Sequence, residues 1–214
     1  MEKTYPLYLM LSRTPTGMGK AIRFFTRYGY NHVSLSLDPE FHQWVSFARY
    51  VQGVPLAGGF VTESPERYFC AEGPIPVKIF RLDISEQRYQ KLQTLFARAG
   101  SASSGLIYNT LGALITPIGL HFTVPGAYTC LEFADAVLEE SHRSIKSLDI
   151  CHRSHLIYEG DLRDLVNDSG NRCGSYFVRR GPWGGTVDTT RHFARLCHRL
   201  IFPRSTDLVT FTLQ

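Results

Sequence analysis

A short segment in the second half of the chain places the strictest local constraint on the fold. Thr129 is followed three residues later by Glu132, just ahead of an apolar run that reaches Leu138. This spacing is typical of a capping box, in which both side chains bind N–H groups at a helix start. The apolar positions of the run cover much of the helix circumference, which predicts a buried helix. The fold must therefore enclose a helix that begins at Cys130.

The predicted position of Cys130 has a chemical consequence. At the first residue of a helix, unpaired N–H groups and the positive end of the helix dipole favour an anion. Such surroundings favour the thiolate, which is the nucleophilic form of cysteine. A free cysteine is more often a small buried hydrophobic residue, so both interpretations of Cys130 stay open on local sequence. A nucleophile would need a base beside it.

The composition is that of an ordinary globular protein. The 214 residues suit one domain with a full core, and 43% of them are hydrophobic and 20% charged. The formal net charge is +4, and the basic residues form no nucleic-acid-binding motif. The longest apolar segment, residues 111–120, is interrupted by glycine and proline and is too short to cross a bilayer. We therefore expect no nucleic-acid partner and no stable membrane insertion.

The cysteines and the N-terminus bear on the cellular compartment. The five cysteines form an odd set without regular spacing, which at this length is typical of reduced thiols rather than of a disulfide scaffold. The first residues lack the apolar core and cleavage site of a signal peptide. The sequence thus predicts a cytoplasmic protein.

The order of the predicted elements favours an α+β fold. Apolar or alternating runs predict strands at 7–11, 30–39, 43–48, 60–62, 77–82 and 154–160. Helical periodicity predicts helices at 18–25, 85–100, 106–115 and 129–138, and a last helix that begins at Asp188 or Thr189 and ends before Pro203. Because most strands precede most helices, we expect α+β rather than a doubly wound sheet.

The strand at 30–39 carries the candidate base. Strict alternation places His32, Ser34 and Ser36 on one face of this strand. The two small serines would leave room for a helix, and His32 stands where its side chain can reach beyond the sheet edge. If the helix that begins at Cys130 packs its first turn there, thiol and imidazole meet. Alone, His32 is more simply explained as a polar strand residue bonded to a loop.

Three segments together resemble a known family. YNHVSLSLD (30–38), YTCLEFADAVLEE (128–140) and IYEGDL (157–162) are similar to the circularly permuted NlpC-type branch of the papain-like cysteine hydrolases, to which lecithin:retinol acyltransferase-like enzymes are related. In the permuted members the histidine strand precedes the cysteine helix, as here. The resemblance implies a papain-like fold, with an antiparallel sheet packed against a central helix that carries the cysteine at its N-terminus. It covers about residues 7–165, so we expect a hydrolase domain at 1–169 and a C-terminal extension at 170–214, with a terminal helix packed on the same domain.

The resemblance also implies roles for individual residues. Cys130 corresponds to the family nucleophile and His32 to the base. The third group, which orients the base, is expected on the strand after the histidine strand, and this points to Ser46. A shift of register would bring Gln43 or His42 there instead. A serine hydroxyl orients an imidazole less strongly than a carboxylate does.

Two further positions concern the surroundings of the thiol. Tyr108 resembles an upstream tyrosine that ordinary members place near the site, which makes it a candidate for substrate binding, although a buried structural tyrosine is the commoner case. Family members often have a serine after the nucleophile, and this chain has Leu131. The oxyanion hole would use the backbone N–H of Cys130, which any residue supplies, and a second donor.

The expected function is that of a cysteine hydrolase. It would act on a peptide, an amide or an acyl ester through an acyl-enzyme, followed by hydrolysis or transfer, without a metal or organic cofactor. The substrate and the oligomeric state are not set by the sequence. One alternative is a non-catalytic binding module on the same fold. Another is a zinc site made by Cys151, His152 and His155, with or without Cys173, although their spacing matches no standard zinc finger.

Overall fold

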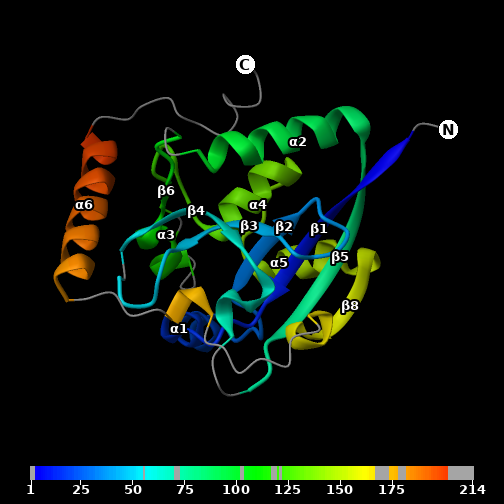
Figure 1. Cartoon of the computed structure of the whole chain (residues 1–214), viewed down its shortest axis with the longest axis horizontal. Helices are drawn as coiled ribbons and strands as arrows, with labels where there is room; N and C mark the ends of the chain where they lie inside the picture. Colours follow the sequence, from blue (N-terminus) through cyan, green and yellow to red (C-terminus); the bar gives the residue numbers. More distant parts are fainter. Residues whose placement is uncertain are drawn as a thin grey trace.

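A six-stranded antiparallel sheet forms the centre of the protein (Figure 1). The computed structural model describes residues 3–54, 56–69, 73–101, 104–116, 120, 122–166, 174–177 and 182–201. The strand order is β4-β3-β2-β1-β5-β8. The strands are β1 (Thr4–Ser12), β2 (His32–Ser36), β3 (Trp44–Arg49), β4 (Gly58–Glu63), β5 (Pro76–Ser85) and β8 (Leu156–Asp161). The α+β class and the antiparallel sheet expected from the sequence are therefore confirmed.

Strand β1 lies in the middle of the sheet because its side chains are apolar on both faces. Leu7, Leu9 and Leu11 point to one face and are fully buried, while Tyr8 and Met10 are buried on the other. On one side β1 pairs with β2, from Tyr8 opposite Ser36 to Ser12 opposite His32; on the other it pairs along its whole length with β5. A run without polar alternation is what a strand covered on both faces requires.

Two helices cover the first face of the sheet. They are α2 (Glu86–Ala99) and α4 (Cys130–Leu138), and in Figure 1 they lie above the strands. Phe133 of α4 packs against Phe47 of β3 with 5.2 Å between ring centroids, in a core that also holds Val33 and Leu35. The helix therefore packs on the Val33 face of β2, and the expectation that Ser34 and Ser36 make room for it is wrong.

The opposite face of the sheet carries short segments instead of long helices. Tyr8, Met10 and Trp44 form a second core there with Tyr68 and Tyr176. The latter two belong to the 3-10 helices η1 (Pro65–Tyr68) and η5 (Ser175–Phe177). The face that carries His32 is thus closed by segments that follow β4 and β8 in the chain.

The region before α4 differs from its prediction. A single helix was expected over 106–115, but Ile107 and Tyr108 form a short strand, β6, and only α3 (Thr110–Ile115) is helical. Strand β6 pairs in parallel with β7 (Ala127–Tyr128), and the Asn109 side chain caps α3 by accepting the N–H of Gly112 at 2.9 Å. Tertiary pairing thus overrides a local apolar pattern that suits either structure.

The last described helix, α6 (Pro182–Ile201), starts earlier than the sequence indicated. Leu196 packs against the core around Ile107 and Val124, His192 donates to the carbonyl of Gly58, and Arg199 donates to the carbonyl of Pro125 at 3.0 Å. Helix α5 (Ile145–Cys151) and the 3-10 helix η3 (Arg153–His155) are among the described elements that were not predicted. Within the described ranges, no helix combines the length and the apolar character needed to span a bilayer.

Candidate active site

Cys130 is the first residue of α4, as the sequence predicts. The N–H of Glu132 donates to the Thr129 hydroxyl at 3.2 Å, and the N–H of Thr129 donates to the Glu132 carboxylate at 2.7 Å. This capping box leaves the N–H of Cys130 at the helix tip, where it has no partner within the helix. Cys130, Cys151 and Cys197 are free thiols, while Cys70 and Cys173 lie outside the described residues.

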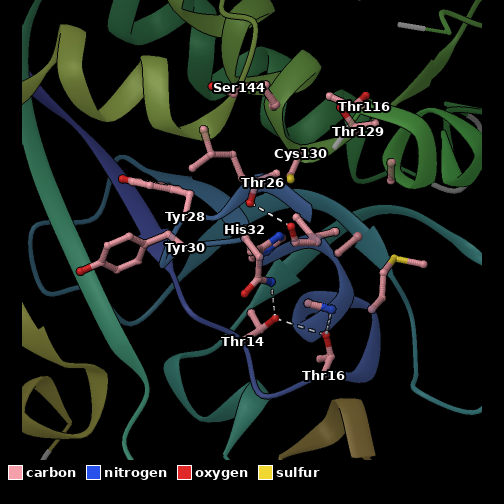
Figure 2. A pocket seen from close by; sticks show the side chains of 18 of the residues that line it. Thr14, Thr16, Thr26, Tyr28, Tyr30, His32, Thr116, Thr129, Cys130 and Ser144 are labelled. Carbon is pink, nitrogen blue, oxygen red and sulfur yellow. Dashed lines mark hydrogen bonds between the residues drawn. The ribbon is translucent and has the colours of Figure 1, made fainter. Parts of the chain in front are cut away.

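His32 lies at the start of β2, where the first turn of α4 meets the end of the sheet. The Cys130 side chain is close enough to its imidazole to raise the pKa of His32, through its charge and through hydrogen bonding. Figure 2 shows both side chains at the same cavity, with the sulfur of Cys130 directed into it. Sequence-distant residues from the two halves of the chain are therefore neighbours, which is the arrangement that a thiol nucleophile and its base require.

The group that orients His32 is Glu63, which the sequence did not reveal. Its two carboxylate oxygens lie 3.0 and 3.2 Å from Nε2 of His32. Ser46, the residue expected in this place, is fully buried and donates its hydroxyl to the carbonyl of Val33 at 2.6 Å. The expectation that Ser46 orients His32 is therefore corrected to Glu63.

The sheet register explains why the carboxylate that contacts His32 comes from β4 and not from the neighbouring strand β3. Strand β3 lies between β2 and β4, and Leu35 of β2 stands opposite Val45 of β3. By alternation, Ser46 lies on the same face of the sheet as His32, in the space between β2 and β4. Because serine is small, the longer Glu63 side chain from the end of β4 reaches across that face to His32. The small side chain of Ser46 thus leaves room for Glu63, and that of Ser34 on the same face does so too.

Glu63 is buried, and its carboxylate is held by polar side chains. Ser34 donates to one carboxylate oxygen at 2.7 Å, and Tyr68 donates to the other at 2.6 Å. The guanidinium of Arg67 lies 3.3 Å from Glu63 and also donates to the carbonyl of Arg49 at 2.7 Å. Such a network fixes the carboxylate in position and satisfies its oxygens in the absence of bulk water.

The electrostatics of the pair follow from these contacts. Burial alone would lower the pKa of His32, but the charge of Glu63 and the hydrogen bonds with Cys130 and Glu63 raise it above its usual range. Burial would raise the pKa of Glu63, but His32 and Arg67 hold it well below its ordinary value. At neutral pH the pair is therefore an imidazolium and a carboxylate. A cationic imidazole beside Cys130 stabilises a thiolate.

The cavity in front of the thiol has a volume of about 340 Å³. Apolar side chains of α1 (Gly17–Thr26), namely Met18, Ile22 and Phe25, form one wall. The charged residues among the described lining residues, apart from His32, are all basic: Arg49, Arg143 and Lys146. The cavity can therefore hold an apolar group and an anionic group beside the nucleophile.

A polar loop holds α1 in place as a wall of this cavity. Thr16 caps the helix by accepting the N–H of Gly19 at 3.0 Å. Asn31, the residue before His32, donates to the Thr14 hydroxyl at 2.7 Å. The dashed line between Thr14 and Thr16 in Figure 2 marks a further hydrogen bond of this loop. The position of α1 is thus tied directly to the strand that carries the base.

Tyr108, the candidate for substrate binding, also lines the cavity. It is buried on β6, and burial together with the charge of a nearby Cys130 thiolate raises the pKa of its phenol. The phenol therefore stays protonated and can donate a hydrogen bond near the thiol. The alternative residues for orienting the base, Gln43 and His42, are exposed on the loop before β3.

The zinc site considered from the sequence does not assemble as expected. Cys151 and His155 are exposed, whereas His152 is buried and bonded to Glu140 at 3.0 Å between Nε2 and Oε2. Cys173 lies outside the described residues. One group of described residues could hold a metal ion, and it consists of Glu140, His142 and His152.

Compared with protein-family models, curated proteins and solved structures, the chain shows no significant match.

Proposed function

We propose that this protein is a cysteine hydrolase or acyltransferase of the papain-like, permuted NlpC type. The observation that carries the proposal is the adjacency of three buried groups, Cys130, His32 and Glu63. Both carboxylate oxygens of Glu63 contact the imidazole, and the Cys130 side chain lies beside it at the same cavity. The order of the elements supports it further, because the histidine strand precedes the cysteine helix and both meet at one end of an antiparallel sheet.

The first half of the reaction is acylation of the enzyme. The Cys130 thiolate attacks the carbonyl carbon of an amide or ester, and the C=O π electrons move to the oxygen. The N–H of Cys130 and the positive end of α4 face this oxyanion. The bond to the leaving group then breaks, and the leaving amine or alkoxide takes a proton from the His32 imidazolium. Because Nε2 of His32 faces Glu63, Nδ1 is the ring nitrogen that serves the reacting atoms.

The second half releases the acyl group. Neutral His32 takes a proton from water or from an acceptor hydroxyl or amine, and the resulting nucleophile attacks the thioester carbonyl. The carbon–sulfur bond breaks, and Cys130 leaves as a thiolate beside a His32 that is again protonated. Glu63 stays ionised throughout and stabilises the imidazolium, while Tyr68 and Arg67 hold it in place.

The cavity lining favours a particular substrate class. The apolar wall formed by α1 suits an acyl chain or another apolar group, and the basic residues Arg49, Arg143 and Lys146 suit a carboxylate or phosphate on the same molecule. We therefore infer an amide or ester whose acyl part is apolar and which also carries a negative charge.

Two measurements test the proposal. Iodoacetamide at pH 6 should alkylate Cys130 in native protein well before Cys151, although Cys151 is exposed and Cys130 is buried. Intact-mass spectrometry after mixing with p-nitrophenyl acyl esters should detect an acyl adduct that is absent in Cys130→Ala and slow to form in His32→Ala. Cys151→Ser is the matched control and should leave both signals unchanged.

The competing function is a non-catalytic binding module. It predicts that Cys130 stays silent toward iodoacetamide and that no acyl adduct forms with any ester of the series. Equal labelling of all thiols would also contradict the enzyme proposal, because it would show that His32 does not activate Cys130.

A further inference from the structure

A second cluster of chemically active side chains lies outside the candidate active site. The segment between α4 and α5 carries Glu140 and His142, and His152 follows α5 directly. Each offers one ligand atom, and these three atoms all lie within 4.8 Å of one another. From this cluster we propose that Glu140, His142 and His152 bind a divalent transition metal, with zinc as the best match.

The distances suit a tetrahedral ion. Oε2 of Glu140 lies 3.3 Å from Nε2 of His142 and 3.0 Å from Nε2 of His152. In a tetrahedral zinc site with bonds of about 2.0–2.1 Å, neighbouring ligand atoms stand roughly 3.3 Å apart. Two of the three separations are therefore near the tetrahedral value, and the third, between the two imidazole nitrogens, is within 4.8 Å. Two imidazoles and one carboxylate are ligands that zinc accepts, and the fourth position is left for water.

A second carboxylate holds His142 in the orientation that ligation needs. Oδ1 of Asp135 lies 2.6 Å from Nδ1 of His142, and Oδ2 of Asp135 accepts the backbone N–H of the same residue at 2.9 Å. When Nδ1 donates its proton to Asp135, Nε2 presents its lone pair toward Glu140 and His152. This carboxylate–histidine pairing recurs behind metal-bound histidines because it fixes both the tautomer and the ring.

Burial and helix ends add to the case. The side chains of His142 and His152 are only 6% and 9% exposed, whereas Glu140 is 39% exposed and gives the ion a path from solvent. The cluster also gathers the C-terminal ends of α4 and α5, since Glu139 and His152 are their respective C-caps. Helix C-termini carry partial negative charge and favour a cation.

The proposed ion has a structural use. Arg143 and Ser144, which follow His142 directly, line the cavity beside Cys130. An ion bound to both ends of α5 and to the end of α4 would clamp this wall of the cavity. The metal site itself does not depend on the proposed hydrolase function, because none of its ligands takes part in the acyl chemistry.

The test measures zinc binding by tag-free protein in competition with a chromophoric chelator. We expect one zinc ion per chain and a higher thermal unfolding temperature in its presence. Glu140→Gln and His152→Ala should abolish both effects, and Asp135→Asn should weaken zinc binding about 10- to 100-fold. His42→Ala, which removes an exposed histidine beside Asp38, and Cys130→Ser should bind zinc as the wild type does.

Cobalt substitution identifies the ligand atoms. A site made of nitrogen and oxygen gives cobalt d–d bands without a thiolate-to-cobalt charge-transfer band. A thiolate band, loss of zinc in Cys130→Ser, or unchanged zinc binding in Glu140→Gln would overturn the proposal, as would protein that takes up no zinc. Glu140→Gln decides the matter if His152→Ala fails to fold, because Glu140 is partly exposed and its amide replacement keeps the same shape.

Discussion

At the scale of single residues, the buried His32–Glu63 pair governs the chemistry of the site. Taking either charge out of water alone costs several kcal/mol, and removing one partner leaves the other uncompensated. Ser34, Tyr68 and Arg67 satisfy the remaining bonds of the carboxylate, so the pair can stay ionised. The imidazolium charge is therefore a fixed feature of the folded protein, available to stabilise a thiolate at Cys130.

The first residue-scale prediction concerns thiol reactivity. Glu63→Gln removes the charge that keeps His32 protonated, so alkylation of Cys130 by iodoacetamide at pH 6 should slow by about tenfold or more, since about 1.4 kcal/mol of lost thiolate stabilisation is a factor of ten. Stopped-time labelling and mass spectrometry measure the rate. Glu66→Gln, three residues away and outside the network, should react as the wild type does. Equal rates for Glu63→Gln and the wild type would show that the carboxylate does not influence the thiol.

The second residue-scale prediction concerns the pH dependence of stability. Because the pKa of Glu63 is lowered, its contribution is present above its ordinary value of 4.5 and is lost as the pH falls below that value. Because the pKa of His32 is raised, its contribution is present below 6.5 and is lost as the pH rises from there toward the raised value. Thermal unfolding of the wild type and Glu63→Gln should therefore differ most between pH 4.5 and 6.5. A difference that is constant from pH 3 to pH 9 would contradict the linkage.

The candidate site could be predicted from the sequence only where local patterns mark it. Cys130 was found because a capping box shows a helix start, and His32 because it opens an alternating strand. Glu63 directly follows the brief strand predicted at 60–62, but its link to His32 depends on β3, with the small Ser46, lying between β2 and β4. No spacing along the chain shows that Glu63 and His32 are neighbours, and the sequence therefore pointed to Ser46 instead of Glu63.

At the scale of elements, α4 joins the chemistry to the fold. Its capping box sets where the helix begins, and its apolar side packs Phe133, Ala134 and Val137 into the main core. The thiol is therefore held by the same contacts that hold the sheet together. A change at the cap alters both stability and the exact position of Cys130.

The element-scale prediction follows from that cap. Thr129→Ala removes the hydroxyl that accepts the N–H of Glu132, so it should lower the free energy of unfolding by about 1 kcal/mol, within a range of about 0.5–2 kcal/mol. Chemical denaturation measures this change. Thr94→Ala, at an exposed interior position of α2, removes a comparable hydroxyl without a cap and should change stability by less than about 0.5 kcal/mol. A loss that is equal in the two variants would show that the cap is not the cause.

The sequence predicted best those helices and strands whose own residues show a clear apolar period. The strands of the sheet and helices α1, α2 and α4 carry clear periodicity, and Thr129 and Ser85 cap the last two as expected. Residues 106–109 were taken as helix because Ile107 and Tyr108 form a strand only by pairing with Ala127 and Tyr128. Helix α5 spans only seven residues, so its apolar positions do not repeat often enough to show a helical period.

At the scale of the whole molecule, the cavity is formed where the two halves of the chain meet. The first half supplies the sheet end with His32 and the apolar wall of α1, and the second supplies Cys130 and the basic residues that follow His142. The thiol, the imidazolium and the basic lining therefore face one space. An anionic substrate would be drawn to this space before any bond changes.

The prediction at this scale concerns the positive charges of Arg143 and Lys146, which should affect substrate binding but not the acyl chemistry. Arg143 and Lys146 are exposed at the cavity, so alanine substitutions there should leave the fold intact. Each lost charge weakens attraction by about 1 kcal/mol at close range, so kcat/KM for an ester with a carboxylate should fall roughly fivefold per substitution. The neutral ester of the same length should be unaffected, and added salt should narrow the difference between the two esters in the wild type. Lys91→Ala on α2 removes the same charge away from the cavity and should change neither ester. An equal loss of kcat/KM for both esters would instead show that Arg143 and Lys146 act by shaping the cavity wall and not by their charge.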